Sequence, residues 1–316
     1  MNLQDLKYFV TAAAERHFGR AAGLCHVSQP TLSAQIRKLE EELGVQLFER
    51  TNRKVMLTET GARLLVHAQR ALAEVAVLEE VAKSARDPLS GPLRLGVIPT
   101  LSPYLMPLLL APMRREHPRM PLVLREEPTQ MLLAALRAHE LDAALLATPV
   151  EGGDLSELRL FDEPLVATLP PHHPLAGQKQ IPEAALASEL MVLSEGHCLA
   201  LQTLTACSTQ MPAMQHGLRA ATLETLVQLV AAGYGCTLIP ALAVPSLRQR
   251  SLVLRPLQGA SLRTIRLVSR TGFARPRALR ALEKTLKSAV LPALAVIAEE
   301  LRLSPDEKRE AASTAV

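Results

Sequence analysis

The sequence contains 316 residues, of which 48% are hydrophobic, 21% are charged and 3% are aromatic, and its net charge is +4. This length predicts two or three domains, because one domain typically contains about 100 to 200 residues. The N-terminus lacks the basic and apolar regions of a signal peptide, and the longest apolar run, near Ala289 to Ala298, is well short of the ~20 residues that cross a membrane. Composition thus argues against a secreted or membrane protein, and we expect a cytoplasmic location.

Three helices are predicted before residue 45. Apolar residues at helical spacing mark the first, near residues 3–13. A second short helix follows from about residue 19 to residue 25. After a two-residue turn, Ser28 can cap a third helix, which carries Pro30 in its first turn. Two short helices and a tight turn before a third helix are typical of a helix-turn-helix.

The third helix has an apolar face with Leu32, Ile36, Leu39 and Leu43, and Gly44 can end it. An isolated helix with this pattern would more often be an ordinary solvated helix, but the helices before it favour a recognition helix in the DNA major groove. Residues 1–60 carry eight basic and seven acidic residues, so the arrangement of residues supports this prediction and the charge does not. The predicted DNA-contacting residues here are Ser28, Gln29, Pro30, Thr31, Ser33, Arg37 and Lys38.

Residues 45–58 predict two short strands around the turn Thr51–Lys54. Arg50, Arg53 and Lys54 would bind phosphates, contacts that position a protein on DNA without reading its sequence. A solvated basic hairpin is the alternative, which the place of the segment after the third helix disfavours. We predict that residues 1–58 form a winged helix-turn-helix domain that binds double-stranded DNA.

Residues 59–86 predict one long helix with a heptad seam. Such a seam indicates a dimerising helix, which suits a protein that reads two DNA half-sites. The alternative is a helix packed on its own domain. The seam residues are Leu64, Ala68, Ala71, Val75, Leu78 and Ala82.

Residues 87–92 predict a hinge by their Pro, Gly and Ser content, and strand-like and helix-like segments alternate beyond it. This alternation predicts an α/β fold with parallel strands and crossover helices. About 210 residues are many for one sheet, so we expect two lobes with a cleft, residues 93–163 with 267–301 and residues 164–266. A strand is expected at Leu190 to Leu193, and the tail 302–316 is expected to be disordered.

The run from Phe18 to Arg50 resembles the DNA-binding signature of the LysR-type transcriptional regulators. The resemblance implies a winged helix-turn-helix, a linker helix and a two-lobed, periplasmic-binding-protein-like effector domain. It further implies homodimers or homotetramers, with RNA polymerase as a further partner. It implies no cofactor and no enzymatic activity.

A narrower resemblance involves the cysteines. The run Ser194–Cys198, Cys207 nine residues later, and residues 231–245 are similar to the peroxide-sensing branch of that family. This similarity implies hydrogen peroxide as the effector, Cys198 as the peroxidatic cysteine and Cys207 as the resolving one. A thiolate attacks peroxide, and the resulting sulfenic acid condenses with a second thiol. A disulfide needs Cα atoms roughly 4.4 to 6.8 Å apart, so bridging could force the segment 199–206, expected as a short helix, to refold.

The same similarity implies a peroxide pocket, and Thr100 and Thr129 match its hydroxyl donors. His197 is adjacent to the sensing cysteine, Arg263 resembles an arginine that could stabilise its thiolate, and Arg270 is a weaker candidate. Cys25 is expected on the buried side of the second helix and Cys236 in an apolar strand, where a free cysteine acts as a small hydrophobic residue, so neither is assigned a redox role. The four cysteines form no CxxC pair, so no metal site is expected.

Two other functions stay open at this point. One is a LysR-type regulator of metabolism whose cleft binds a small organic effector, with incidental cysteines. The other is a thiol peroxidase, which the predicted DNA-binding domain disfavours. The sequence also departs from the peroxide-sensing pattern after the second cysteine, where residues 209–214 replace more acidic ones.

Overall fold

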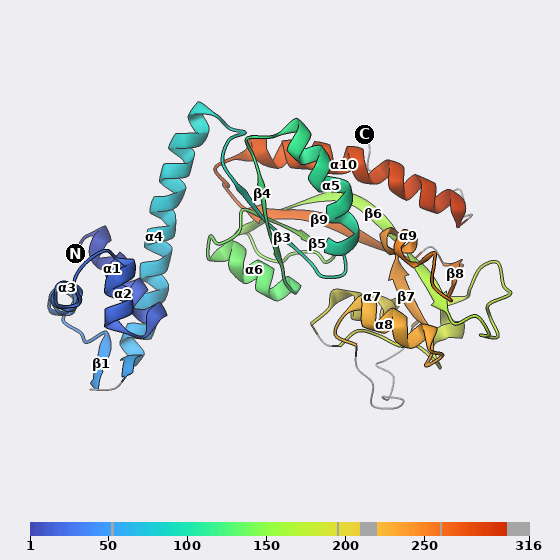
Figure 1. The fold of residues 1–316 in the computed structure, drawn as a ribbon, viewed down its shortest axis with the longest axis horizontal. Coiled ribbons are helices and arrows are strands. Elements are labelled where there is room, and N and C mark those ends of the chain that lie inside the picture. The colour runs from blue at the N-terminus through green and yellow to red at the C-terminus, as the bar shows by residue number, and fades with distance from the viewer. Residues whose placement is uncertain (52–53, 195, 209–219, 260, 302–316) are drawn as a thin grey trace. The chain divides into compact units, whose positions relative to one another are not determined.

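The computed structural model describes residues 1–51, 54–194, 196–208, 220–259 and 261–301. The chain forms two compact units, Met1–Arg86 and Asp87–Val316. Figure 1 shows the ribbon of both units. No helix of the described residues is both long enough and apolar enough to cross a membrane.

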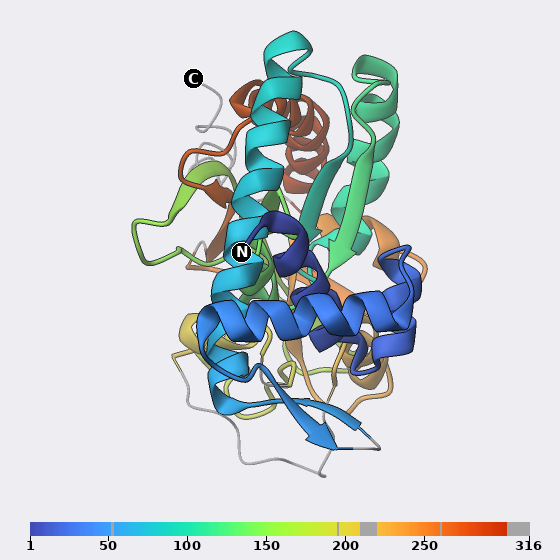
Figure 2. The same cartoon turned by 90° about the vertical axis from the view of Figure 1, so that its left-hand side faces the viewer.

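Three short helices, a hairpin and one long helix make up the first unit. Ser28 caps the third helix by accepting a hydrogen bond from the Thr31 amide, and Gly44 ends it in the left-handed conformation. Figure 2 shows this helix and the hairpin. The elements are α1 (Leu3–Glu15), α2 (Phe18–Leu24), α3 (Gln29–Leu43), β1 (Phe48–Thr51), β2 (Lys54–Leu57) and α4 (Glu59–Arg86).

A small core holds the first unit together. The Phe48 ring makes edge contacts with Phe9 and Phe18 at centroid distances of 5.7 and 5.5 Å. Glu40 is buried on α3, and its Oε1 accepts hydrogen bonds from the Leu47 and Phe48 amides at 2.8 and 3.2 Å. These contacts fix the hairpin against α1, α2 and α3.

Helix α4 begins and ends where the sequence predicts, but its seam divides into two parts. Ala68 is buried and Leu64 is half-buried in the core of the first unit. Farther along the helix, Ala71 and Leu78 are exposed. The first turns of the seam therefore pack on their own domain, as the alternative prediction had it for the whole helix. The later turns are exposed and remain available to a partner subunit.

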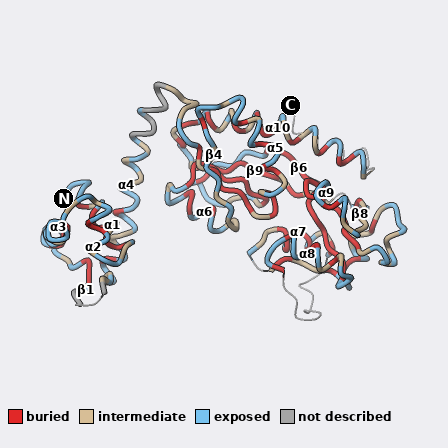
Figure 3. Tube along the Cα trace, viewed as in Figure 1, coloured by how far each residue is buried: buried red, intermediate tan, exposed pale blue. Residues whose placement is uncertain are grey.

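The second unit is a two-lobed α/β domain around a mixed sheet with the strand order β4-β3-β5-β9-β6-β7, in which β8 also pairs with β6. Figure 3 shows that buried residues concentrate in its central strands. The elements are β3 (Leu93–Val97), α5 (Ser102–Glu116), β4 (Leu122–Glu126), α6 (Thr129–Arg137), β5 (Ala143–Leu146), β6 (Leu155–Leu169), η1 (Glu183–Leu186), α7 (Cys198–Ala206), α8 (Leu223–Ala231), β7 (Thr237–Pro240), η3 (Ala241–Ala243), α9 (Val244–Leu247), β8 (Val253–Pro256), β9 (Leu262–Arg270) and α10 (Pro276–Glu300).

Two expectations about this sheet are wrong. Only β3 with its neighbours β4 and β5 is parallel, since the long strands β6 and β9 run antiparallel to each other and to the strands beside them. The segment Leu190–Leu193 forms no strand, because each end makes one isolated bridge, to Cys236 and to Ala220. Its apolar residues face the core without a ladder partner.

Candidate functional site

Helix α7 carries both cysteines that the sequence singles out. Cys198 is its first residue and is half-buried, and Cys207 is its C-cap and is buried. Nine residue steps of about 1.5 Å place their Cα atoms roughly 13 Å apart along the helix axis. This separation is about twice what a disulfide allows. The pair can therefore bridge only if α7 unwinds.

Opposing influences act on the Cys198 thiol. Burial raises its pKa, and the Arg263 charge, the Thr129 hydroxyl and the Leu199 amide each lower it in part. Burial has the larger effect, so the net pKa is above the ordinary value. At neutral pH the protein holds a thiol whose thiolate is nonetheless supported by a cation, by the Thr129 hydroxyl and by the backbone amides of Leu199 and Cys198.

Arg263 organises this site from strand β9. Its Nη1 donates to the Thr100 hydroxyl at 3.0 Å, and its Nη2 donates to the Thr100 carbonyl at 3.2 Å. Its Nε donates to Glu163 Oε2 at 2.8 Å, and neither side chain of this ion pair is exposed. The arginine is therefore held in one orientation by a strand residue and by the turn after β3.

Glu163 is a site residue that sequence reasoning missed. It lies opposite Arg263 in the β6–β9 ladder, and its Oε1 accepts a hydrogen bond from the Leu242 amide at 2.8 Å. The sequence did contain a signal for a buried charge, because the acidic Glu163 lies just before the apolar run from Leu165 to Leu169. Without the register of the ladder, nothing paired this residue with the arginine.

Thr100 and Thr129 both lie at carboxyl ends of parallel strands, where ligands of α/β sheets commonly bind. Thr100 follows β3 and is buried. Thr129 begins α6, its hydroxyl is buried, and no described oxygen or nitrogen pairs with it. This hydroxyl lowers the pKa of Cys198, as stated above. The structure thus brings both threonines to the same site as Cys198 and Arg263.

Cys207, at the C-terminal end of α7, lies in a different environment from Cys198. Burial, with a smaller contribution from Glu183, raises the pKa of Cys207 to about 11. Between the cysteines, Gln202 donates from Nε2 to the Ala147 carbonyl at 2.7 Å, while its Oε1 is buried and unpaired among the described residues. Sequence reasoning missed this contact as well, since it joins α7 to the residue after β5.

Arg270 and His197, which were also predicted for the pocket, do not share the contacts of the other pocket residues. Arg270 lies at the other end of β9, seven residues and roughly 23 Å from Arg263. It donates to the Leu136 and Leu141 carbonyls and lies over the Phe273 ring, so the structure does not bring it to the cysteine. The expectation failed because both arginines share one strand but not one end. His197 is the N-cap of α7 without a side-chain capping bond, and it is not among the groups that shift the Cys198 pKa.

The other cysteines keep their expected environments in part. Burial raises the pKa of Cys236 to about 12, and its thiol lies against the Leu186 carbonyl at 3.6 Å. Cys25 is the C-cap of α2 and is half-buried, less covered than expected. The described residues contain no group of three or more His, Cys, Asp or Glu side chains arranged to hold a metal ion.

The polar face of α3 forms the candidate DNA-contacting surface. Ser33 is half-buried, and the remaining residues of that prediction lie open to solvent. In the wing, Arg50 and Lys54 belong to β1 and β2, but their side chains and the whole of Arg53 lie outside the described residues. The exposed residues are Ser28, Gln29, Pro30, Thr31, Arg37 and Lys38.

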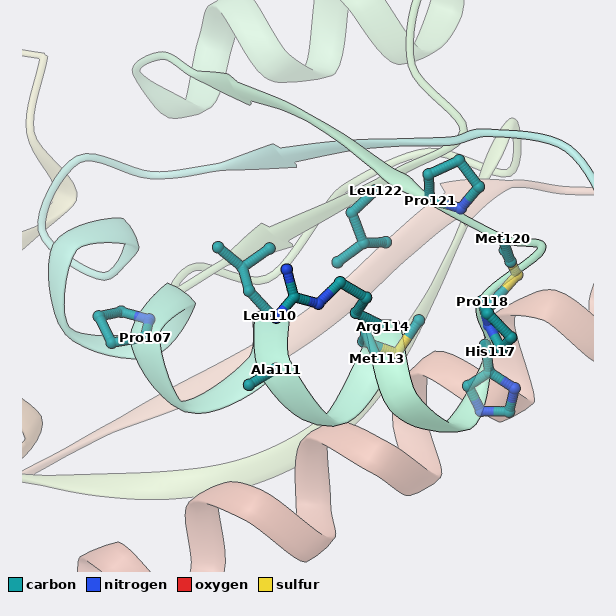
Figure 4. A pocket seen from close by; sticks show the side chains of 10 residues that line it. All are labelled: Pro107, Leu110, Ala111, Met113, Arg114, His117, Pro118, Met120, Pro121 and Leu122. Carbon is teal, nitrogen blue, oxygen red and sulfur yellow. The ribbon is translucent and has the colours of Figure 1, made fainter.

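A separate pocket of about 450 Å³ lies between α5 and the start of β4. Figure 4 shows its mostly apolar lining, which includes Leu110 and Met113, with Arg114 and His117 among the side chains around it. None of the residues predicted for the cysteine site line it.

Two family models match the chain. Residues 3–62 match the bacterial regulatory helix-turn-helix protein, lysR family, and residues 86–290 match the LysR substrate binding domain. The DNA-binding transcriptional dual regulator OxyR of Escherichia coli is 46% identical over 275 residues, which cover 86% of this chain and 90% of that protein. A probable hydrogen peroxide-inducible genes activator of Mycobacterium avium is 44% identical over 251 residues, 79% of this chain and 81% of that protein.

Solved structures give the same picture. Full-length OxyR from Pseudomonas aeruginosa, with a cysteine-to-aspartate substitution, matches with a TM-score of 0.74 and 38% identity over 92% of this chain and 98% of that chain. A hydrogen peroxide-bound cysteine mutant of Corynebacterium glutamicum OxyR matches with a TM-score of 0.65 and 36% identity over 95% of each chain. Both matches extend across the two units.

Proposed function

The chain belongs to the LysR family of bacterial transcriptional regulators, and we propose that it senses hydrogen peroxide through Cys198 and changes its DNA contacts in response. The observation that carries the proposal is the placement of Cys198 beside Arg263 and Thr129, with Cys207 at the other end of the same helix. The similarity to OxyR proteins, one of them solved with hydrogen peroxide bound, supports it.

In the first step, the Cys198 thiolate attacks one peroxide oxygen. An S–O bond forms, the O–O bond breaks, and the leaving hydroxide takes up a proton to become water. The thiolate arises when Cys198 loses its proton, a loss that Arg263 favours. Because Arg263 donates to the Thr100 hydroxyl oxygen, the Thr100 proton is free to point elsewhere and can donate to peroxide. The Thr129 hydroxyl, which has no oxygen or nitrogen partner among the described residues, can turn from the Cys198 sulfur and donate to peroxide as well.

In the second step, the Cys207 sulfur attacks the Cys198 sulfenic acid. An S–S bond forms, the S–O bond breaks, and water leaves, so that two thiols and one peroxide yield a disulfide and two waters. Bridging requires α7 to lose its helical conformation, including the Gln202 bond to Ala147. We propose that this refolding alters the contacts between subunits of a dimer or tetramer, and with them the spacing of two α3 helices on double-stranded DNA. RNA polymerase would be the further partner of an activating form.

The experiment treats the reduced full chain with one equivalent of peroxide, maps its thiols by mass spectrometry and footprints it on its own promoter region. We expect a Cys198–Cys207 disulfide, a trapped sulfenic acid in Cys207→Ser and no footprint change in Cys198→Ser. Cys25→Ser is the matched control and should respond like the wild type. A footprint that shifts equally in Cys198→Ser would overturn the proposal and favour a small organic effector. With excess peroxide and a thiol reductant present, consumption of peroxide should remain slow and roughly stoichiometric, whereas a thiol peroxidase would turn over many equivalents.

A further inference from the structure

The buried ion pair of Glu163 and Arg263 is the most enclosed charged contact described in the effector domain. Neither side chain is exposed, and Glu163 Oε2 lies 2.8 Å from both the Nε and the Nη2 of Arg263. The second carboxylate oxygen is occupied by the Leu242 amide at 2.8 Å. Water therefore cannot screen this pair, and its charges act strongly on the groups around it.

Arg263 faces two partners that prefer a cation. One is the Glu163 carboxylate, and the other is the Cys198 sulfur, whose pKa Arg263 lowers against the larger effect of burial. The pKa of Tyr104 is affected by both charges of the pair. Burial and Glu224 raise the pKa of Tyr104 to about 12, and among the smaller influences Arg263 lowers it while Glu163 raises it. The Glu163 carboxylate thus offsets part of the effect that the positive charge of Arg263 has on the pKa of a nearby group.

We propose that Glu163 competes with the Cys198 thiolate for the positive charge of Arg263 and thereby sets the peroxide level at which the sensor responds. Glu163 is a positioning residue, because it acts through Arg263. The consequence for sensing rests on the proposed function, whereas the competition is a property of the reduced protein. Since only the thiolate reacts, a stronger hold of Glu163 on Arg263 means less thiolate at rest and a higher threshold.

Other charged or titratable groups face this region from several elements. Tyr104 lies on α5, and near it Glu224 of α8 pairs with Arg250 at 2.7 Å. His197 precedes Cys198 at the start of α7. These groups are unchanged in the variants below, so differences between variants report the Glu163–Arg263 pair.

The test measures the pH dependence of Cys198 alkylation by iodoacetamide in the reduced full chain. Glu163→Gln should lower the apparent pKa of Cys198 by about one unit, so that alkylation and peroxide oxidation at pH 7 become about tenfold faster. Arg263→Gln should raise the apparent pKa, and the double variant should also lie above the wild type. Asp142→Asn is the matched control, because Asp142 is also a buried carboxylate paired with an arginine, Arg94, at 2.6 Å, and it should leave the Cys198 pKa unchanged.

An apparent pKa that is unchanged or higher in folded Glu163→Gln would overturn the proposal, since it would make Glu163 only an anchor for Arg263. If Glu163→Gln does not fold, Glu163→Asp decides, because it withdraws the carboxylate by one methylene and should lower the pKa by a smaller amount. No decrease in folded Glu163→Asp would overturn the proposal equally. A lowered alkylation pKa in a protein that peroxide does not oxidise would refute the proposed function and leave the competition standing.

Discussion

Cys198 and Cys207 occupy the two ends of one helix, so the same nine-residue element that separates the thiols must open before they can join. Cys198 is half-buried beside a cation, whereas Cys207 is enclosed in the core. This placement supports the proposed order of events, in which peroxide reaches the first thiol while the second is still buried. In the proposed mechanism, we expect the stability of α7 to limit how fast the second step can occur.

Replacement of Gln202 by alanine should accelerate disulfide formation. The variant loses the hydrogen bond that ties α7 to the Ala147 carbonyl, a contribution of about 1 kcal/mol. If helix opening limits the second step, the disulfide should form about fivefold faster after a peroxide pulse. Rapid quenching with an alkylating agent, followed by mass spectrometry, measures this rate.

Gln228→Ala provides the control for this variant, because Gln228 donates its side-chain amide to Glu224 on α8 at 3.2 Å. It should form the disulfide at the wild-type rate. Equal rates in Gln202→Ala and the wild type would show that the Ala147 contact does not restrain α7.

Stability should fall at alkaline pH because of the buried thiols. Burial raises the pKa of Cys207 from 9.0 to about 11, so the folded protein retains a proton that the unfolded chain loses. This contribution is complete below about pH 9 and is lost as the pH rises toward 11, by about 2 kcal/mol. Urea unfolding of the reduced protein between pH 8 and 11 measures it. Cys207→Ala should make this slope shallower whatever its stability at pH 8, while Cys236 and Tyr104, whose pKa values burial raises to about 12, account for the slope that remains. An unchanged slope would refute the assignment.

Local sequence signals predicted the local structure well. Ser28 and Gly44 delimit α3 through capping chemistry that depends on adjacent residues only, and α4 runs without interruption through a stretch that contains no proline. Relations between distant residues were less accessible. The Glu163–Arg263 contact spans 100 residues and depends on the register of two antiparallel strands. Periodicity does not encode that register. The family similarity does not encode it either, and it suggested Arg270, which lies at the other end of β9.

Arg270 should matter for folding and not for the reactivity of Cys198. Its guanidinium donates to the Leu136 and Leu141 carbonyls, which would be left without this donor in Arg270→Ala. We expect a loss of about 1 to 3 kcal/mol in unfolding free energy. The pH profile of Cys198 alkylation should match that of the wild type, in contrast to Arg263→Gln. A shifted pH profile in Arg270→Ala would contradict this prediction and show that Arg270 does influence the Cys198 thiol.

The exposed part of the α4 seam should mediate dimerisation. Leu78 lies on the seam and is 69% exposed, which is unfavourable for a large apolar side chain unless a partner covers it. Leu78→Glu should therefore shift the protein toward monomers in sedimentation experiments. Ala76→Glu, also exposed but off the seam, should keep the wild-type assembly. Identical assembly of both variants would assign association to other surfaces.

Two neighbouring cations on α3 should affect DNA binding differently. Arg37 and Lys38 are both exposed, but Lys38 approaches Glu42 at 4.0 Å, whereas no ion pair of Arg37 is described. If Arg37 reads a base, Arg37→Ala should weaken operator binding by about 1 to 3 kcal/mol and relax sequence preference at one position. If Lys38 contacts a phosphate, Lys38→Ala should weaken binding to all sequences and reduce the salt slope by about one. Titrations against specific and random duplexes at several salt concentrations separate these effects. The reverse pattern would assign base contact to Lys38 and phosphate contact to Arg37, which would require a different rotation of α3 in the major groove.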